Sequence, residues 1–359
     1  MTRTLALVPW DISKPQSGGT QRCHALLTAI PDLTTFALVW DEKAQTHQKI
    51  GGMNYRAIYA GDEAVNRAAK LFRQGITSYD PIPRLVDEEL TALREAIDEY
   101  DPDLMLLHHP WLIDLTCGRP FIYDAHNCES VATMQRMGKN SLDYDLVHEL
   151  EHDAVIEAEH ITYCSEADWR TITRTWPNHA DGTHIPNGTH IPKAQTNGKK
   201  LNLIFVGSYY LPNVYAAQRL ADIGRRLPEY QIHLVGGASL GVETNATNVT
   251  RHGVISDDKL EQLLNEAHIF VNAVSNGSGT SLKIPQALAH GIPVVSTTIG
   301  ARGYETEVSI SDDLEEYPAI IRTITADWKA HHNTARRNAH NHDWANIRQD
   351  YARVIRALQ

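Results

Sequence analysis

Residues 275–297 read Ser275-Asn-Gly-Ser-Gly-Thr-Ser-Leu-Lys-Ile-Pro-Gln-Ala-Leu-Ala-His-Gly-Ile-Pro-Val-Val-Ser-Thr297. The pattern predicts a strand that ends near Ala273, a Gly/Ser/Thr loop, and a helix that begins near Thr280 or Ser281. The first N–H groups of a helix lack partners and the helix dipole is positive there, so we expect this turn to bind an anion. Lys283 would add a positive charge. An ordinary strand–loop–helix connection is the alternative.

Short apolar runs alternate with helical stretches on both sides of this segment, which is typical of parallel α/β sheets. In the first half the predicted strands are Thr4–Val8, Thr35–Val39, Tyr55–Tyr59, Leu104–Leu107, Phe121–Tyr123 and His160–Tyr163. In the second half they are Leu203–Val206, Ile232–Val235, Val249–His252, Ile269–Asn272 and Pro293–Ser296. The predicted helices are Asp87–Glu99, Tyr144–Glu159, Asn213–Leu227, Asp258–Ala267, Ser281–His290 and a final stretch over Ala326–Leu358.

A linker is predicted at residues 188–200, because this segment has turn-forming residues and no periodicity. We therefore expect a Rossmann-like N-terminal domain over 1–190 and a Rossmann-like C-terminal domain over 191–340. The last helix, 341–359, is expected to pack back on the N-terminal domain. Two parallel-sheet domains facing each other imply a cleft, and ligands of such sheets bind at the carboxyl ends of the strands.

The composition points to a globular chain without a broad nucleic-acid surface. The 359 residues carry a formal charge of −11, with 42% hydrophobic and 21% charged residues. A nucleic-acid footprint normally needs a basic face. No apolar run is long enough to span a membrane, and the amino end lacks the pattern of a signal peptide. Four widely spaced cysteines predict reduced thiols and a cytoplasmic protein.

The segment 275–297 resembles the C-terminal signature of the group 1 glycosyltransferases, the retaining family four enzymes of the GT-B fold. Further landmarks match in the family's order: Phe205-Val-Gly-Ser208, Leu234-Val-Gly-Gly237, Gly253-Val-Ile-Ser-Asp257 and Gly300-Ala-Arg-Gly303. The resemblance implies that 191–340 is a nucleotide-sugar (donor) domain and 1–190 an acceptor domain. Several ordered landmarks are far more specific than any single motif.

The resemblance also implies donor-binding residues. These are Gly207, Ser208, Ser278, Gly279, Thr280, Ser281, Lys283 and Gln286. Two departures from the family stand out. Many relatives have glutamate at the positions of Gln286 and Ser278, and they carry an Arg/Lys pair where this chain has Tyr209, Tyr210 and Leu211.

Two stretches of the first half resemble family elements that border the substrates. They are the loop Ser17-Gly-Gly-Thr-Gln-Arg22, which follows the first strand, and the motif Asp124-Ala-His-Asn-Cys-Glu129. The sugar and acceptor residues implied are Gly18, Gly19, Arg22, Asn127 and Glu129. Relatives have a histidine at the end of the strand before this motif, so His109 is the first catalytic candidate and His126 the second; a structural hydrogen bond is the alternative for each. Members of the family transfer sugars with retention, and no metal ligands or other cofactors are implied: Mg²⁺ is not required.

Three other signals indicate weaker hypotheses. His148-Glu-Leu-Glu-His152 has the spacing of a zinc-protease helix, but a solvated helix face is favoured. Arg67, Lys70 and Arg73 would form a basic helix face that could contact an anionic membrane peripherally, against a plain solvated face. Aromatic side chains near the expected cleft could stack on sugars or belong to the core: Trp10, Trp111 and Tyr210.

The function expected from these features is transfer of a sugar from a nucleotide-diphosphate sugar to a hydroxyl acceptor with retention, the reaction of a hexosyltransferase. The departures at Gln286, Ser278 and Tyr209–Leu211 leave a non-catalytic nucleotide-sugar-binding or partner subunit as the alternative. A sugar-nucleotide epimerase is a third hypothesis, without a specific carboxylate signature. The donor base, the sugar, the acceptor (glycan, lipid or other) and the oligomeric state stay open.

Overall fold

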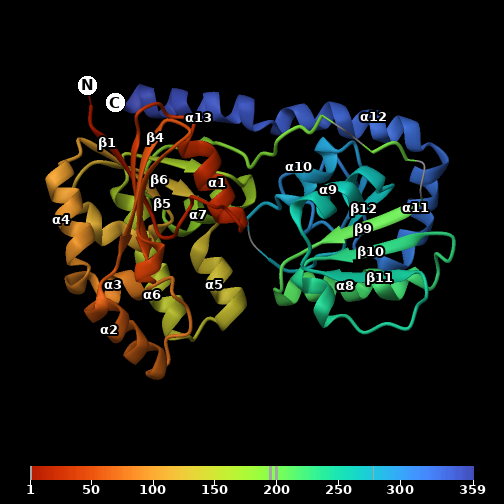
Figure 1. Cartoon of the computed structure of the whole chain (residues 1–359), viewed down its shortest axis with the longest axis horizontal. Coiled ribbons are helices and arrows are strands. Elements are labelled where there is room, and N and C mark those ends of the chain that lie inside the picture. The colour runs from red at the N-terminus through yellow and green to blue at the C-terminus, as the bar shows by residue number, and fades with distance from the viewer. Residues whose placement is uncertain (1, 194–195, 199–200, 278) are drawn as a thin grey trace. The chain divides into compact units, whose positions relative to one another are not determined.

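The computed structural model describes residues 2–193, 196–198, 201–277 and 279–359 (Figure 1). The chain forms two compact units. The first unit runs to Pro186 and also includes Ile347–Gln359, and the second is Asn187–Asn346. The sequence had predicted that the N-terminal domain ends at residue 190 and the C-terminal domain at residue 340.

The first unit is built on an eight-stranded sheet with the order β3-β4-β2-β1-β5-β6-β7-β8. Every neighbouring pair is parallel except β3 with β4. The strands are β1 (Thr4–Val8), β2 (Thr34–Val39), β3 (Thr46–Ile50), β4 (Met53–Tyr59), β5 (Leu104–His108), β6 (Phe121–Ala125), β7 (His160–Tyr163) and β8 (Gly182–His184). The helices are α1 (Gly18–Leu27), α2 (Asp62–Arg73), α3 (Ile82–Leu85), α4 (Thr91–Tyr100), α5 (Glu129–Met137), α6 (Leu142–Glu157) and α7 (Glu166–Thr175).

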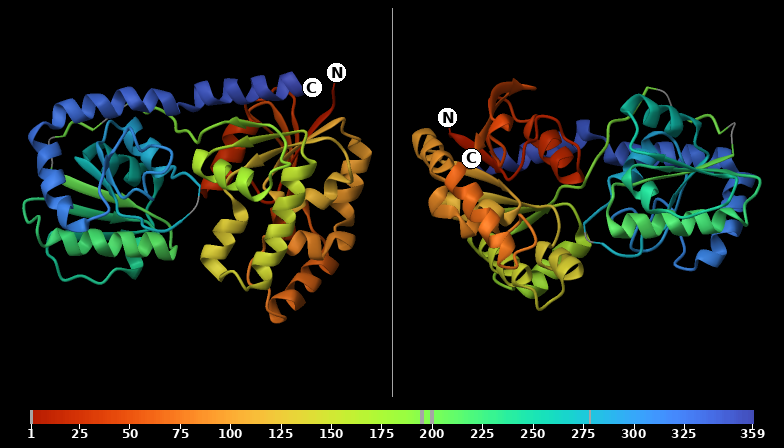
Figure 2. Two further views of the ribbon diagram at one scale, coloured as in Figure 1. Left: turned by 180° about the vertical axis from the view of Figure 1, so that it is seen from behind. Right: turned by 60° about the horizontal axis from the view of Figure 1, so that its bottom comes forward.

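The central strands β1, β5 and β6 are buried along their whole length. Strands buried on both faces are typical of a parallel sheet covered by helices on each side. One hydrophobic cluster joins these strands to residues of α2, α4 and α6, such as Ala68, Leu93 and Leu150. The end of the last helix also belongs to this unit, since Gln359 Nε2 donates to Thr4 Oγ1 at 2.7 Å. The two termini therefore lie together (Figure 2).

The second unit has a six-stranded sheet in the order β11-β10-β9-β12-β13-β14, parallel throughout its paired strands. Its strands are β9 (Asn202–Val206), β10 (Gln231–Val235), β11 (Val249–Gly253), β12 (Ile269–Asn272), β13 (Val294–Ser296) and β14 (Ser309–Ile310). Its helices are α8 (Leu211–Gly224), α9 (Asp257–Glu266), α10 (Lys283–Ala289), α11 (Tyr317–Ala326) and α12 (Trp328–Ala339), and α13 (Trp344–Leu358) begins here.

Two separate cores sandwich this second sheet. One contains Leu220 of α8 and Ile321 of α11, and the other contains Leu263 of α9, Leu288 of α10 and Ala335 of α12. Figure 1 shows α8 on one face of the strands and α9 and α10 on the other. Both units thus have the predicted α/β architecture, with the carboxyl ends of their strands leading into the predicted site loops.

The structure corrects several predicted elements. The helix after residues 275–282 begins at Lys283 rather than at Thr280 or Ser281, and it has only seven residues. The final helical stretch over 326–358 is divided at residues 340–343. The short or polar strands β3, β8 and β14 were not predicted.

Candidate functional site

His109 follows β5 with a backbone conformation that side chains rarely adopt. Its φ is 63° and its ψ is 158°, a region occupied almost only by glycine. Holding a non-glycine residue there costs about 1–3 kcal/mol. The residue is 4% exposed, and its Nε2 is buried with no hydrogen-bond partner among the described residues. A strained residue with an unpaired buried ring nitrogen is the feature expected of a ligand-binding histidine.

The other ring nitrogen of His109 is fixed by Glu129. Nδ1 lies 2.8 Å from Glu129 Oε1, and Asn127 Nδ2 donates to the same oxygen at 3.0 Å. Burial would raise the pKa of Glu129, but the charge and hydrogen bond of His109 and the amide of Asn127 outweigh it and lower this pKa. The carboxylate therefore orients the imidazole so that Nε2 is the free nitrogen. The structure brings together His109, Asn127 and Glu129, three of the candidate residues from the sequence.

Glu129 is itself positioned by Glu151 on α6. The two carboxylate oxygens of Glu151 accept hydrogen bonds from the backbone N–H groups of Glu129 and Ser130, at 2.6 and 2.8 Å. They thereby cap the start of α5. Glu151 is fully buried, and this burial raises its pKa to about 7 although the two N–H groups oppose the rise. Sequence reasoning missed Glu151, because it set the surrounding His148–His152 motif aside as a solvated face.

The predicted glycine loop lies beside the free nitrogen of His109. A Cβ atom on Gly19 would sit 3.4 Å from His109 Nε2 and 3.1 Å from Cζ3 of Trp10. Glycine at position 19 thus leaves room next to the imidazole. Gly18, exposed, begins α1, and Ser17 caps this helix by accepting the Thr20 N–H. The start of a helix, a half-buried tryptophan and an unpaired imidazole nitrogen therefore converge.

Arg22, on the same helix, points inward instead. Its Nε and Nη2 donate to the two carboxylate oxygens of Asp124 at 2.9 and 2.7 Å, and both side chains are 1% exposed. Although burial acts the other way, Arg22 and the histidines beside it lower the pKa of Asp124 well below its usual range. His126 Nε2 also lies 3.0 Å from Asp124 Oδ2. Arg22 and His126 thus face a buried carboxylate, whereas His109 keeps a nitrogen free.

In the second unit, Asn213 joins two of the predicted donor residues, Lys283 and Ser208. Lys283 Nζ donates to Asn213 Oδ1 at 2.6 Å, and Asn213 Nδ2 donates to the backbone oxygen and Oγ of Ser208, both at 3.3 Å. The ammonium also lies 5.2 Å from the centre of the Phe205 ring. Burial lowers the pKa of Lys283 to about 8, and among the described residues no carboxylate pairs with it.

The loop before α10 is held by side chains from two directions. Asn187 Nδ2 donates to Thr280 Oγ1 at 2.9 Å, and Arg302 Nη2 donates to the backbone oxygen of Gly277. Gly279, Thr280 and Ser281 lie in this loop rather than in a helix. Ser278 lies outside the described residues. Gln286, half-buried, lies on α10.

Gly207 and Gly236 set the backbone of the facing loops in this unit. Gly236 has φ 87°, and a Cβ there would collide with the carbonyl oxygen of Gly207. Gly207 therefore packs directly on backbone, next to Asn213. The sequence indicated Gly207 and Ser208 but missed Asn213 and Arg302 as side chains of the site. Their signals were present as Pro212-Asn213 and Gly300-Ala-Arg-Gly303.

Other hypotheses receive no support from the geometry. Trp111 is 3% exposed and packs in the core, so it offers no face to a sugar. His152 is half exposed and pairs with Asp153, while His148 packs between Tyr144 and Trp176. These two histidines are not among the possible metal-binding groups of the described residues.

The basic helix expected over residues 67–73 is α2. Its Arg67 pairs with Glu89 at 2.8 Å, which fits a solvated helix face. Within the described residues, no helix combines the length and apolar character that crossing a membrane needs. All four cysteines are free.

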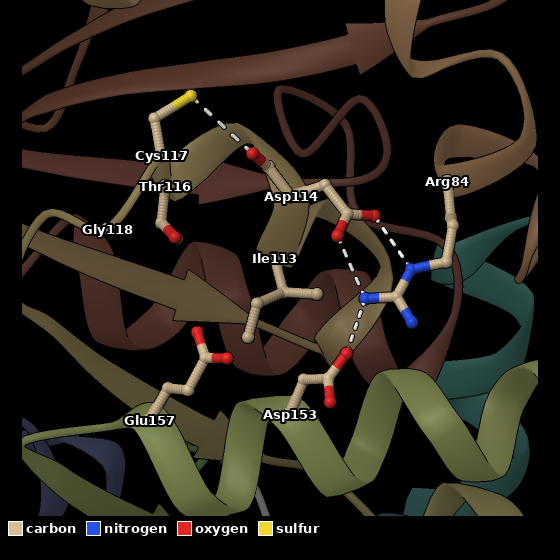
Figure 3. A pocket seen from close by; sticks show the side chains of 8 residues that line it. All are labelled: Arg84, Ile113, Asp114, Thr116, Cys117, Gly118, Asp153 and Glu157. Carbon is tan, nitrogen blue, oxygen red and sulfur yellow. Dashed lines mark hydrogen bonds and ion pairs between the residues drawn. The ribbon is translucent and has the colours of Figure 1, made fainter.

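A separate pocket of about 200 Å³ lies between α3, α6 and residues 113–118 of the first unit. Figure 3 shows Arg84 between Asp114 and Asp153, with hydrogen bonds of 2.7–2.8 Å to both. Its guanidinium is therefore already neutralised by carboxylates. None of the described residues that were predicted for the site lines this pocket.

Comparison with known proteins defines the class. Over nearly the whole chain, the structure resembles a sucrose-phosphate synthase from Thermosynechococcus elongatus, with a TM-score of 0.79, 16% identity, and 99% of each chain covered. It also resembles Anabaena HepE in complex with UDP-glucose, with a TM-score of 0.67, 14% identity and 99% of each chain covered. A UDP-forming trehalose-phosphate synthase from Burkholderia xenovorans gives a TM-score of 0.70 at 12% identity, with 99% of each chain covered. The fold is that of the GT-B glycosyltransferases.

A family model matches part of the sequence. Residues 200–327 match the family described as Glycosyl transferases group 1. A Klebsiella pneumoniae protein, described as an uncharacterized 44.6 kDa protein in the cps region, is 28% identical over 122 residues. That match spans 29% of this chain and only 31% of the Klebsiella protein. The predicted resemblance is confirmed: residues 200–327 match the group 1 glycosyltransferases, and the GT-B fold extends over the whole chain.

Proposed function

We propose that the protein transfers a glycosyl unit from a nucleotide-diphosphate sugar to a hydroxyl acceptor, with retention at the anomeric carbon and without an obligatory metal. The observation that carries this proposal is the half-buried ammonium of Lys283, which has a neutral amide and an aromatic ring as neighbours but no carboxylate partner among the described residues. A partly desolvated charge without a counter-ion is costly, and an arriving diphosphate would neutralise it. The same ammonium would stabilise the negative charge that develops on the leaving diphosphate in the transition state.

Arg302 and the loop before α10 would complete the phosphate site. The guanidinium Nε of Arg302 is buried and has no partner in the described part of the chain, while Nη2 anchors the loop at Gly277. A guanidinium with an unused N–H suits a phosphate oxygen. This residue would take over the role of the Arg/Lys pair that the chain lacks at Tyr209–Leu211.

His109 would hold the transferred sugar. Glu129 fixes the ring through Nδ1, so Nε2 is available for a sugar hydroxyl next to Gly19. In a front-face mechanism the leaving diphosphate takes the acceptor proton, so the protein needs to position the sugar rather than to supply a strong base. A buried and oriented imidazole fits this positioning role. Because the Anabaena protein was solved with UDP-glucose, uridine diphosphate sugars are the first donors to test.

One observation favours a second candidate, a nucleotide-sugar-binding subunit without turnover. Gln286 stands where relatives have a glutamate for the ribose hydroxyls, so the site lacks a charged acceptor there. Such a protein would bind a donor and release no diphosphate with any acceptor.

The test is release of nucleoside diphosphate from a panel of nucleotide sugars, each with and without a panel of hydroxyl acceptors. Proton NMR of the glycoside then gives its anomeric configuration. Acceptor-dependent release with the configuration of the donor supports the proposal. An inverted product contradicts the retaining mechanism, donor binding without release supports the binding subunit, and interconversion of donors without acceptor would indicate an epimerase.

A further inference from the structure

Behind the His109 site, three buried side chains form a cluster that the proposed reaction does not use. Cys23 comes from α1, His108 ends β5 and His126 follows β6. Their ligand atoms, the Cys23 thiol sulfur and one ring nitrogen of each histidine, all lie within 4.8 Å of one another. Cys23 and His108 are fully buried, and His126 is 6% exposed. The cluster thus joins three elements at the carboxyl edge of the sheet.

Around His126 Nε2 the spacing is close to that of a tetrahedral metal site. His108 Nδ1 lies 3.2 Å from His126 Nε2, and His126 Nε2 lies 3.8 Å from Cys23 Sγ. A fourth atom, Asp124 Oδ2, is 3.0 Å from each of the two nitrogens. Zn–N bonds of about 2.0–2.1 Å and Zn–S bonds of about 2.3 Å place the ligands of a tetrahedral ion roughly 3.3–3.6 Å apart. A shift of the Cys23 side chain toward His108 and Asp124 would therefore admit the ion.

Hydrogen bonds alone leave this cluster poorly satisfied. Asp124 Oδ2 already accepts a hydrogen bond from Arg22 Nε at 2.9 Å. If His108 Nδ1 and His126 Nε2, each 3.0 Å away, both carried protons, three donors would meet one oxygen with two lone pairs. If His108 Nδ1 carried no proton, its lone pair would face the carboxylate oxygen at 3.0 Å. Either assignment of the histidine protons contains an unfavourable contact. A cation between the four atoms removes it.

We propose that Cys23 Sγ, His108 Nδ1, His126 Nε2 and Asp124 Oδ2 bind a divalent transition metal of the zinc class. On binding, Cys23 loses its thiol proton to solvent, and each imidazole keeps its one proton on the opposite nitrogen. For His108 that nitrogen is Nε2, which lies 3.4 Å from the Tyr351 hydroxyl and would donate to it. The metal is structural: it ties α1 to the ends of β5 and β6, next to His109, whose ring centre is 3.9 Å from that of His126.

Arg22 makes the thiolate indispensable. Its guanidinium already balances the charge of Asp124. The ion, Asp124 and Arg22 together carry a charge of about +2, which the Cys23 thiolate reduces to about +1. Loss of this thiolate would therefore weaken binding sharply in a buried site. Sequence reasoning predicted no metal ligands, since Cys23 and His126 are 103 positions apart.

The experiment is titration of the tag-free, chelator-treated full chain with Co²⁺ and Zn²⁺, followed by absorption spectroscopy, elemental analysis and thermal unfolding. We expect one Co²⁺ per chain, the intense visible bands of a tetrahedral site, a thiolate-to-cobalt charge-transfer band, and a higher Tm with Zn²⁺. Cys23→Ala should lose the charge-transfer band and bind roughly 100-fold more weakly or worse. Cys128→Ala, which removes another buried thiol of the same unit, should leave binding unchanged.

The charge-transfer band is measured on the wild-type protein. It therefore tests thiolate binding even if the Cys23→Ala variant fails to fold. Absence of stoichiometric metal, a bound metal without the thiolate band, or unchanged binding in Cys23→Ala would each overturn the proposal. The last two outcomes would indicate that other histidines of the chain bind the ion.

Discussion

Lys283 and Asn213, 70 positions apart, are joined by a hydrogen bond of 2.6 Å from Nζ to Oδ1. It links the first residue of α10 to the first turn of α8, and the same amide reaches Ser208 in the loop after β9. Three of the predicted donor residues, Gly207, Ser208 and Lys283, thereby surround one side chain. Because the amide is neutral, the ammonium keeps its charge available for an anion.

Nucleotide binding should weaken at alkaline pH. Burial lowers the pKa of Lys283 to about 8, so its ammonium is present below pH 8 and lost above it. Affinity for nucleoside diphosphate, measured by calorimetry, should fall as the pH rises from 7 to 9. Lys283→Arg stays charged throughout this range and should give a flatter profile. A wild-type affinity independent of pH would contradict the assignment.

Asn213→Asp tests the neutrality of the partner. The new carboxylate would lie within hydrogen-bonding distance of Lys283 Nζ, neutralise it and repel a diphosphate. We expect diphosphate affinity to fall by about tenfold, on the order of 1.4 kcal/mol, while the ligand-free protein gains thermal stability. The control is Asn245→Asp, an exposed amide in the loop before β11. Equal affinity in both variants would remove Asn213 from the donor site.

His109→Gln should separate binding from turnover. The substitution removes the imidazole nitrogen beside Gly19 but leaves Lys283 untouched, so the Kd for nucleoside diphosphate should stay the same. Turnover should fall by about 100-fold, the scale typical of lost positioning by one side chain. His152→Ala, a half-exposed histidine on α6, serves as the control. A His109→Gln variant with full turnover would show that the strained residue is structural.

Glu151 should make the stability of the fold depend on pH. Its folded pKa is about 7 against an ordinary value of 4.5, so between these values the folded protein holds a proton that the unfolded chain has lost. The free energy of unfolding should therefore decrease as the pH rises from 4.5 to 7, by on the order of 3 kcal/mol from this group.

Glu151→Gln is neutral at every pH and should not show this decrease, whereas the exposed neighbour Glu149→Gln should behave like the wild type. Urea unfolding at several pH values measures the difference. Parallel curves for Glu151→Gln and the wild type would contradict the buried, partly protonated carboxyl.

Local sequence patterns predicted the central strands well. Runs such as Thr4–Val8 and Ile269–Asn272 are buried on both faces, so their apolar character is continuous and their ends are marked by turn residues. The edge strand β3, Thr-His-Gln-Lys-Ile, is largely exposed and depends on antiparallel pairing with β4. No apolar pattern in its own residues indicates it.

The helix near residue 280 shows a different limit. Gly-Thr-Ser resembles a helix start, yet tertiary bonds from Asn187 and Arg302 hold these residues in a loop and the helix begins at Lys283. The residues of the donor loop were predicted, but their partner Asn213 follows another strand. The cluster of Cys23, His108, Asp124 and His126 likewise draws its side chains from α1, β5 and the end of β6. Such contacts depend on strand order, which periodicity does not reveal.

The central claim is that Lys283 and its loop bind the diphosphate of a nucleotide sugar. The most direct measurement is the thermal shift of the wild type and of Lys283→Ala with uridine, guanosine, thymidine and adenosine diphosphates and their sugars. We predict that one base raises the wild-type Tm by several degrees as diphosphate and as sugar, and that this rise is lost in Lys283→Ala but kept in the exposed control Lys259→Ala. An equal rise in wild type and Lys283→Ala, or no rise with any nucleotide, would contradict it.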